Sequence, residues 1–150
     1  MKKIELICVG KIKEKFYIDA INEYAKRLTR FCDFEITELK EYGDNKNAVE
    51  SESSEIVAKL NGYSILLDLK GTSVSSADFA KTIDTAFTQG AKKIQIIIGG
   101  SNGVNDIVRQ KADKIFNFGA ITYPHQLFRV IATEQIYRAF NILNNTPYHK

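Results

Sequence analysis

Two strand-length segments of the chain consist of consecutive apolar residues, Ile65–Leu67 and Ile96–Ile98. A strand with one face in water alternates apolar and polar residues, whereas a run of apolar residues suits a strand that is covered on both faces. Strands of that kind are typical of parallel sheets that lie between two layers of helices. The two segments therefore predict central strands of a sheet flanked by helices.

The rest of the chain alternates strand and helix patterns from end to end, which predicts an α/β fold with a mainly parallel sheet. Asn47 with Glu50, and Ser75 with Asp78, have the spacing of a capping box at a helix start. Gly71 is expected to end a strand and Gly90 to end a helix. The predicted strands cover about residues 3–10, 34–39, 63–71, 93–100 and 116–124, and the predicted helices about 13–31, 47–60, 75–89, 106–115 and 125–144.

Length and composition predict a single globular domain over residues 1–150, since 44% of the residues are hydrophobic and 26% are charged. The longest apolar runs are far shorter than the about 18 residues of a transmembrane helix, and the segment MKKIELICVG predicts a first strand without a signal peptide. Cys8 and Cys32 are isolated and histidines do not cluster, so we expect no metal site and a cytoplasmic setting. The net charge of +3 fits a polyanionic partner without identifying one.

Three predicted strands end in irregular, glycine-containing segments at residues 67–71, 99–103 and 119–124. In an open parallel sheet, ligands bind beyond the carboxyl ends of the strands, because loops and helix N-termini meet there. Glycine lets bare backbone groups approach a ligand closely. These three strand ends are therefore the predicted site.

The motif G-x-S-x-G around Ser101 allows a second interpretation, the nucleophile elbow of a serine hydrolase. Asp106 or Asp113, followed by His125 or His149, would complete a triad in the expected chain order. An α/β-hydrolase usually needs a larger sheet than about five strands, and no HGG-like oxyanion segment precedes the motif. In the plainer interpretation, Ser101 is a turn residue that bonds to its neighbours.

The C-terminal region offers further candidates, each with a structural alternative. His125 is expected to cap the start of the last helix, and the terminal TPYHK is either functional or frayed. Apolar residues surround most of the last helix, which indicates a subunit contact. Arg129, Glu134 and Arg138 are interpreted as surface ion pairs of little energetic value.

Three segments in this order, IIIGGSNGV, ITYPHQLFRVIATEQIYRAF and a terminal PYHK, together resemble the bacterial RlmH family. The resemblance extends over nearly the whole chain and includes the start ICVGKIKEKF. Members of this family are SPOUT-class methyltransferases of the large ribosomal subunit. The resemblance implies a C-terminal trefoil knot, S-adenosylmethionine as cofactor, a homodimer, and methyl transfer to N3 of a pseudouridine in 23S ribosomal RNA on assembled ribosomes.

The resemblance also assigns roles to residues of this chain. Tyr148, His149 and Lys150 match the terminal motif near the transferred methyl group, although some relatives have arginine and one further residue at the position of Lys150. In this interpretation the G-x-S-x-G match is accidental, and a knotted RNA-binding protein without catalysis is the alternative. The implied cofactor residues are Leu67, Gly99, Gly100, Gly103, Phe118, Gly119, Ala120, Ile121, Thr122 and Tyr123.

Overall fold

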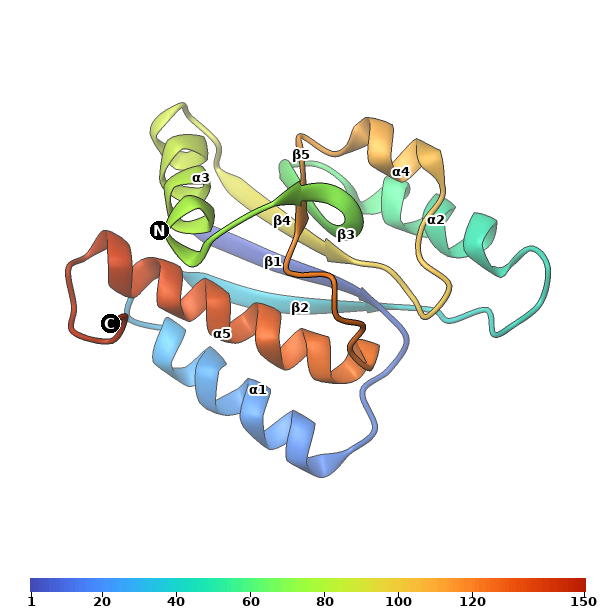
Figure 1. The fold of residues 1–150 in the computed structure, drawn as a ribbon, viewed down its shortest axis with the longest axis horizontal. Helices are drawn as coiled ribbons and strands as arrows, with labels where there is room; N and C mark the ends of the chain where they lie inside the picture. The colour runs from blue at the N-terminus through green and yellow to red at the C-terminus, as the bar shows by residue number, and fades with distance from the viewer.

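The computed structural model describes all 150 residues and contains one five-stranded, all-parallel sheet in the order β2-β1-β4-β3-β5 (Figure 1). The predicted α/β fold with a parallel sheet flanked by helices is thereby confirmed. The strands are β1 (Lys3–Val9), β2 (Asp33–Leu39), β3 (Tyr63–Ser73), β4 (Lys93–Ile98) and β5 (Lys114–Asn117). The helices are α1 (Lys15–Leu28), α2 (Ala48–Lys59), α3 (Ser76–Thr88), α4 (Asp106–Lys111) and α5 (His125–Leu143).

The sheet separates two hydrophobic layers, and the central strands contribute to both. Ile96 and Ile98 of β4 belong to the larger cluster, with side chains of α3 and α5, whereas Ile97 belongs to the smaller one with side chains of α2 and α4. Helices α1 and α3 both contact α5, and α2 contacts α4 (Figure 1). The consecutive apolar residues thus bury both faces of β4, as predicted. None of the helices combines the length and apolar composition needed to cross a membrane.

Two predicted strand ends are wrong. β5 covers Lys114–Asn117, so residues 118–124 of the predicted strand are irregular. β3 continues through Gly71 to Ser73, with a register shift against β5 between Leu67 and Thr72. A Cβ atom at Gly71 would lie 2.6 Å from the carbonyl oxygen of Ile115. Gly71 therefore permits close packing of two strands and does not end one.

Helix ends follow the sequence signals only in part. Ser75 caps α3 as predicted, since its hydroxyl accepts the Asp78 backbone N–H at 3.0 Å. The predicted capping box at Asn47 is wrong, because Asn47 makes no capping bond and the Glu50 carboxylate accepts the side-chain amide of Asn105 at 3.0 Å. Helix α4 also ends at Lys111, four residues earlier than predicted.

Arg129 of α5 is buried, which contradicts the prediction of a surface ion pair. Its side chain is 1% exposed. Its Nη1 atom donates to the Glu38 carboxylate at 2.7 Å, and Nη2 donates to the carbonyls of Val9 at 2.9 Å and Gly10 at 2.7 Å. The guanidinium therefore joins α5 to the carboxyl ends of β1 and β2. Arg138 and Glu134, by contrast, form the predicted i,i+4 pair at 2.9 Å.

We expect Arg129→Met to lower the free energy of unfolding by about 3 kcal/mol, because it leaves the Glu38 carboxylate and two buried carbonyls without their donor. Urea denaturation measures the change. Lys15→Met is the control, since the Lys15–Asp19 pair is exposed to 87% and 59% and its loss should cost less than about 1 kcal/mol. Equal changes in the two variants would contradict the structural role given to Arg129.

Candidate active site

A cavity of about 290 Å³ lies at the carboxyl edge of the sheet, where β4 and β5 end and where β3, after Leu67, stops pairing with β4. Apolar side chains and backbone groups form most of its wall. Of the residues predicted to bind a cofactor, only Ala120 is absent from the lining. The others line it together: Leu67, Gly99, Gly100, Gly103, Phe118, Gly119, Ile121, Thr122 and Tyr123.

The glycines after β4 allow the chain to bend where no larger residue fits. A Cβ atom at Gly99 would lie 2.8 Å from Cγ1 of Val104, and one at Gly100 would lie 2.8 Å from a carboxylate oxygen of Glu52. Gly103 has a φ of +79°, and its N–H donates to the carbonyl of Gly100 at 2.9 Å. The bend therefore brings bare backbone to the cavity wall.

The irregular segment after β5 forms the opposite wall. Phe118 meets Phe79 edge to face with ring centroids 5.4 Å apart, and Tyr123 stacks on Phe128 at 5.8 Å. Gly119 has a φ of +121°, and its N–H donates to the side-chain oxygen of Asn117 at 2.7 Å. These contacts fix an aromatic wall that suits a flat, apolar ring.

Five polar or aromatic residues that were not assigned to the cofactor site also line the cavity: Asp68, Ser101, Asn117, His125 and Phe128. Asp68 directly follows Leu67, so the rule that selects strand ends could have found it. Its carboxylate accepts Arg109 Nε at 2.7 Å, and this hydrogen bond is the main cause that raises the pKa of Arg109. The predicted capping role of His125 is wrong, since α5 has no side-chain cap.

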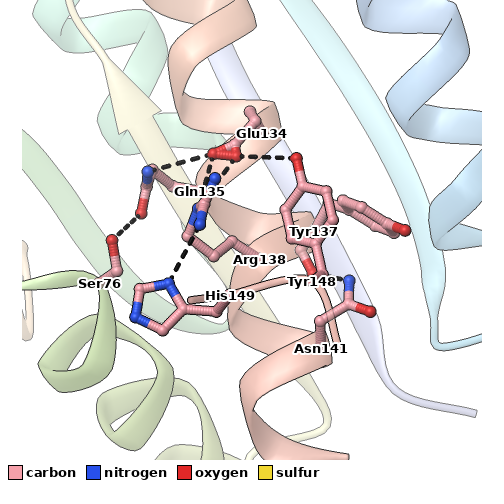
Figure 2. Close-up of polar contacts among 8 residues, drawn as sticks. All are labelled: Ser76, Glu134, Gln135, Tyr137, Arg138, Asn141, Tyr148 and His149. Carbon is pink, nitrogen blue, oxygen red and sulfur yellow. Dashed lines mark hydrogen bonds and ion pairs between the residues drawn. The ribbon is translucent and has the colours of Figure 1, made fainter. Parts of the chain in front are cut away.

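The terminal residues Tyr148, His149 and Lys150 do not line this cavity. They follow the other end of α5, and Figure 2 shows Tyr148 and His149 beside its C-terminal half. Glu134 lies nine residues after His125, about 13 Å along the helix axis at 1.5 Å per residue. A single chain therefore does not bring the two halves of the predicted site together.

Contacts with α5 hold the tail in place. The Tyr148 ring meets Tyr137 edge to face at 4.7 Å, and its hydroxyl donates to the Glu134 carboxylate at 3.4 Å (Figure 2). Arg138 lies over the Tyr148 ring at 4.8 Å and contacts Nδ1 of His149 at 3.0 Å. Burial, followed by the negative charge of Glu134, raises the pKa of Tyr148 to about 12. The phenol is therefore neutral at physiological pH.

The serine hydrolase triad does not form. Ser101 and His125 both line the cavity, but neither side chain makes a hydrogen bond. The carboxylates that could complete the triad have other partners, Asp106 with Arg109 at 2.9 Å and Asp113 with the backbone N–H of Ser64 at 2.8 Å. Without a base held on its hydroxyl, Ser101 has no means of activation.

Comparison with known proteins defines the class of the chain. A family model described as "Predicted SPOUT methyltransferase" matches residues 1–149. Among solved structures, a probable methyltransferase from Bordetella pertussis has a TM-score of 0.61 at 12% identity, covering 93% of this chain and 96% of that one. The SpoU methyltransferase AviRb from Streptomyces viridochromogenes, solved with the cofactor AdoMet, has a TM-score of 0.52 at 13% identity, covering 96% and 62%. At such identities these structures share the fold alone, and that fold is the one of SPOUT methyltransferases.

Two relatives narrow the class further, and both are named ribosomal RNA large subunit methyltransferase H. The one from Fusobacterium nucleatum is 47% identical over 98% of this chain and 99% of its own length. The one from Streptococcus uberis is 44% identical over 99% of both chains. The chain belongs to the ribosomal RNA large subunit methyltransferase H family of SPOUT methyltransferases. The resemblance seen in the sequence is thereby confirmed.

Proposed function

We propose that the chain transfers a methyl group from S-adenosylmethionine to N3 of a pseudouridine in 23S ribosomal RNA of the large subunit. We further propose that it works as a homodimer on assembled ribosomes in the cytoplasm. The observation that supports this most directly is its 47% identity, over nearly full length, to a ribosomal RNA large subunit methyltransferase H. The cavity and the terminal motif supply the residues for such a reaction.

The cavity residues fit this cofactor in shape and chemistry. The aromatic and apolar wall around Phe118 and Leu67 suits an adenine ring, and the backbone of residues 119–123 offers neutral donors and acceptors. At Gly99 and Gly100 the backbone packs so closely against Val104 and Glu52 that no side chain fits, which leaves bare backbone at the cavity wall. When bound, S-adenosylmethionine supplies an electrophilic methyl group, so the chain has mainly to align donor and acceptor.

The remaining step is the removal of the proton from N3 of the base, and we assign this step to the tail residues. Tyr148 is neutral, so it positions the base by stacking and hydrogen bonding. His149 is one candidate to accept the proton, because imidazole titrates near neutral pH. Water is the other, with the Lys150 ammonium stabilising the anionic ring. In both cases the tail must lie close to the methyl group.

A dimer reconciles this requirement with the distance between tail and cavity. In one chain the tail packs on Glu134, Tyr137 and Arg138 (Figure 2), and none of its residues lines the cavity. If the tail of one subunit reaches the cavity of the other, both halves of the site meet without any change in the fold. We therefore infer that each active site combines residues from two subunits.

Calorimetric titration tests the cofactor site. We expect saturable binding of S-adenosylmethionine, and Ile121→Arg should weaken it at least tenfold, because it adds bulk and positive charge beside a cationic ligand. Ile107→Arg is the matched control: Ile121 is 70% exposed at the cavity and Ile107 is 52% exposed on α4 outside it. No binding to the wild-type protein at millimolar ligand would contradict the proposal and favour a knotted RNA-binding protein without catalysis.

A chain that ends at Pro147 tests the role of the tail. We expect it to fold and to bind S-adenosylmethionine within a few-fold of the full chain, since the tail does not line the cavity. Transfer of a tritiated methyl group to large ribosomal subunits should fall more than 100-fold. Full activity of this chain would exclude Tyr148, His149 and Lys150 from the reaction.

Mixing two inactive proteins distinguishes a shared site from one within a single chain. The Ile121→Arg chain keeps its tail and the truncated chain keeps its cavity, so a mixed dimer contains one complete site only if the tail acts across subunits. We expect the mixture to recover methyl transfer after subunit exchange. A mixture as inactive as its components would show that the tail serves its own cavity.

The pKa of Tyr148 gives a prediction about pH. Burial and Glu134 raise the pKa of Tyr148 to about 12, whereas it is about 10 in an unfolded chain. The neutral phenol therefore stabilises the docked tail fully below about pH 10. This stabilisation is lost as the pH rises through about 12. Tyr148→Phe should therefore lower the rate of methyl transfer without changing the shape of its pH profile between about pH 6 and 9. If the pH–rate profile of Tyr148→Phe lacked the ascending limb of the wild-type profile, Tyr148 would instead be identified as the base.

A further inference from the structure

The segment that joins β1 to α1 leaves the sheet beside the cavity. β1 pairs directly with β4, with Cys8 opposite Ile98, so both strands end at the same edge (Figure 1). A Cβ atom at Gly100 would lie 3.2 Å from Cγ1 of Val9, the last residue of β1. The residues after Val9 therefore start next to the glycine bend that forms the cavity wall.

Four side-chain hydrogen bonds fix the backbone of this segment. Buried Arg129 donates to the carbonyls of Val9 and Gly10 at 2.9 and 2.7 Å. Glu38, which Arg129 also holds, accepts the N–H of Ile12 at 2.7 Å. The N–H of Lys13 donates to the side chain of Gln126 at 3.1 Å, in the first turn of α5. A surface segment with so many side-chain bonds to its backbone presents its own side chains in a fixed arrangement.

The segment between β1 and α1 places the side chains of two lysines on the surface. Ile12 is half-buried and lines a small cavity together with Arg129. Lys11 and Lys13, on either side of it in the chain, are both exposed. Neither lysine forms an ion pair, whereas the next one, Lys15, is bound to Asp19 at 2.7 Å.

Neighbouring charges leave this face basic. Lys11 and Lys13 line a shallow depression together with Lys40, whose ammonium lies 4.8 Å from the centre of the Tyr42 ring. The acidic groups there are Glu38, which Arg129 neutralises, and Glu41, and Glu14 follows Lys13 in the chain. We refer to Lys11 and Lys13 as the lysine pair.

We propose that the lysine pair binds phosphate groups of the RNA that flank the nucleotide entering the cavity; this rests on the proposed function. Lysine is a point charge that suits phosphate, and contacts to phosphate fix the position of a nucleic acid without reading its sequence. In the proposed function an RNA nucleotide enters the cavity, so phosphates of the neighbouring nucleotides lie at its rim. The rigid segment that carries the lysine pair lies beside this rim, where it can bind these phosphates.

The experiment compares two double variants that each remove two lysines. Lys11→Gln with Lys13→Gln neutralises the pair, and Lys81→Gln with Lys92→Gln is the control, because both of these lysines are exposed, one on α3 and one before the amino end of β4. Binding to purified large ribosomal subunits is measured over a range of salt concentrations. Calorimetry with S-adenosylmethionine and thermal unfolding show whether the fold and the cofactor site are intact.

We expect the lysine-pair variant to bind subunits at least tenfold more weakly than wild type at 0.1 M salt. The slope of log K against log salt should become shallower by about 1.4 to 1.8, since each lost phosphate contact contributes about 0.7 to 0.9. The control variant should match wild type in both quantities, and all three proteins should bind S-adenosylmethionine alike.

Two results separate this proposal from the proposed function. If the wild-type protein methylates subunits and the lysine-pair variant keeps its affinity and salt slope, the phosphate contact is overturned while the methyltransferase stands. If the variant loses affinity and salt slope but the wild-type protein transfers no methyl group, the RNA contact is supported and the enzymatic proposal fails.

Discussion

Parallel pairing of β1, β4 and β3 determines where everything else in this protein lies. Parallel strands point toward the same edge, so the segments after β1 and β4 and the part of β3 that follows Leu67 lie together there without any specific attraction between them. The same pairing requires helices on both faces, which explains why consecutive isoleucines of β4 contribute to two different hydrophobic layers. Fold and cavity thus have one common cause.

The cavity wall is built from backbone and aromatic rings, and its chemistry follows from that. Gly99 and Gly100 are closely packed against Val104 and Glu52, so the bend is rigid even though its residues lack side chains. Among aspartate, glutamate, lysine and arginine side chains, only Asp68 lines the cavity, and it is already paired with Arg109. In the proposed function this wall holds the cofactor, and the separate, well-packed tail supplies the acid–base chemistry.

Sequence patterns predicted those features that depend on neighbours along the chain. The strand at Ile96–Ile98, the cap at Ser75 and the glycine bend all follow from local rules. Gly71 and Arg129 were misjudged because their roles depend on distant partners, the backbone of Ile115 and the carboxylate of Glu38. Neither partner can be inferred from spacing, since a glycine in a strand and an arginine in a helix both have simpler explanations.

The last helix shows how one such distant contact links stability to function. Through Arg129, α5 is bonded to the end of β1 and to Glu38, and through Gln126 it holds the backbone of Lys13. Residues of the same helix line the cavity at its start and hold the tail at its end. Replacing both partners of a buried ion pair by apolar residues often costs little stability, because removing charges from water is costly, whereas removing Arg129 alone leaves Glu38 and two carbonyls without their donor. The role of Arg129 is also geometric, since it bonds the start of the basic segment to the helix that lines the cavity and holds the tail.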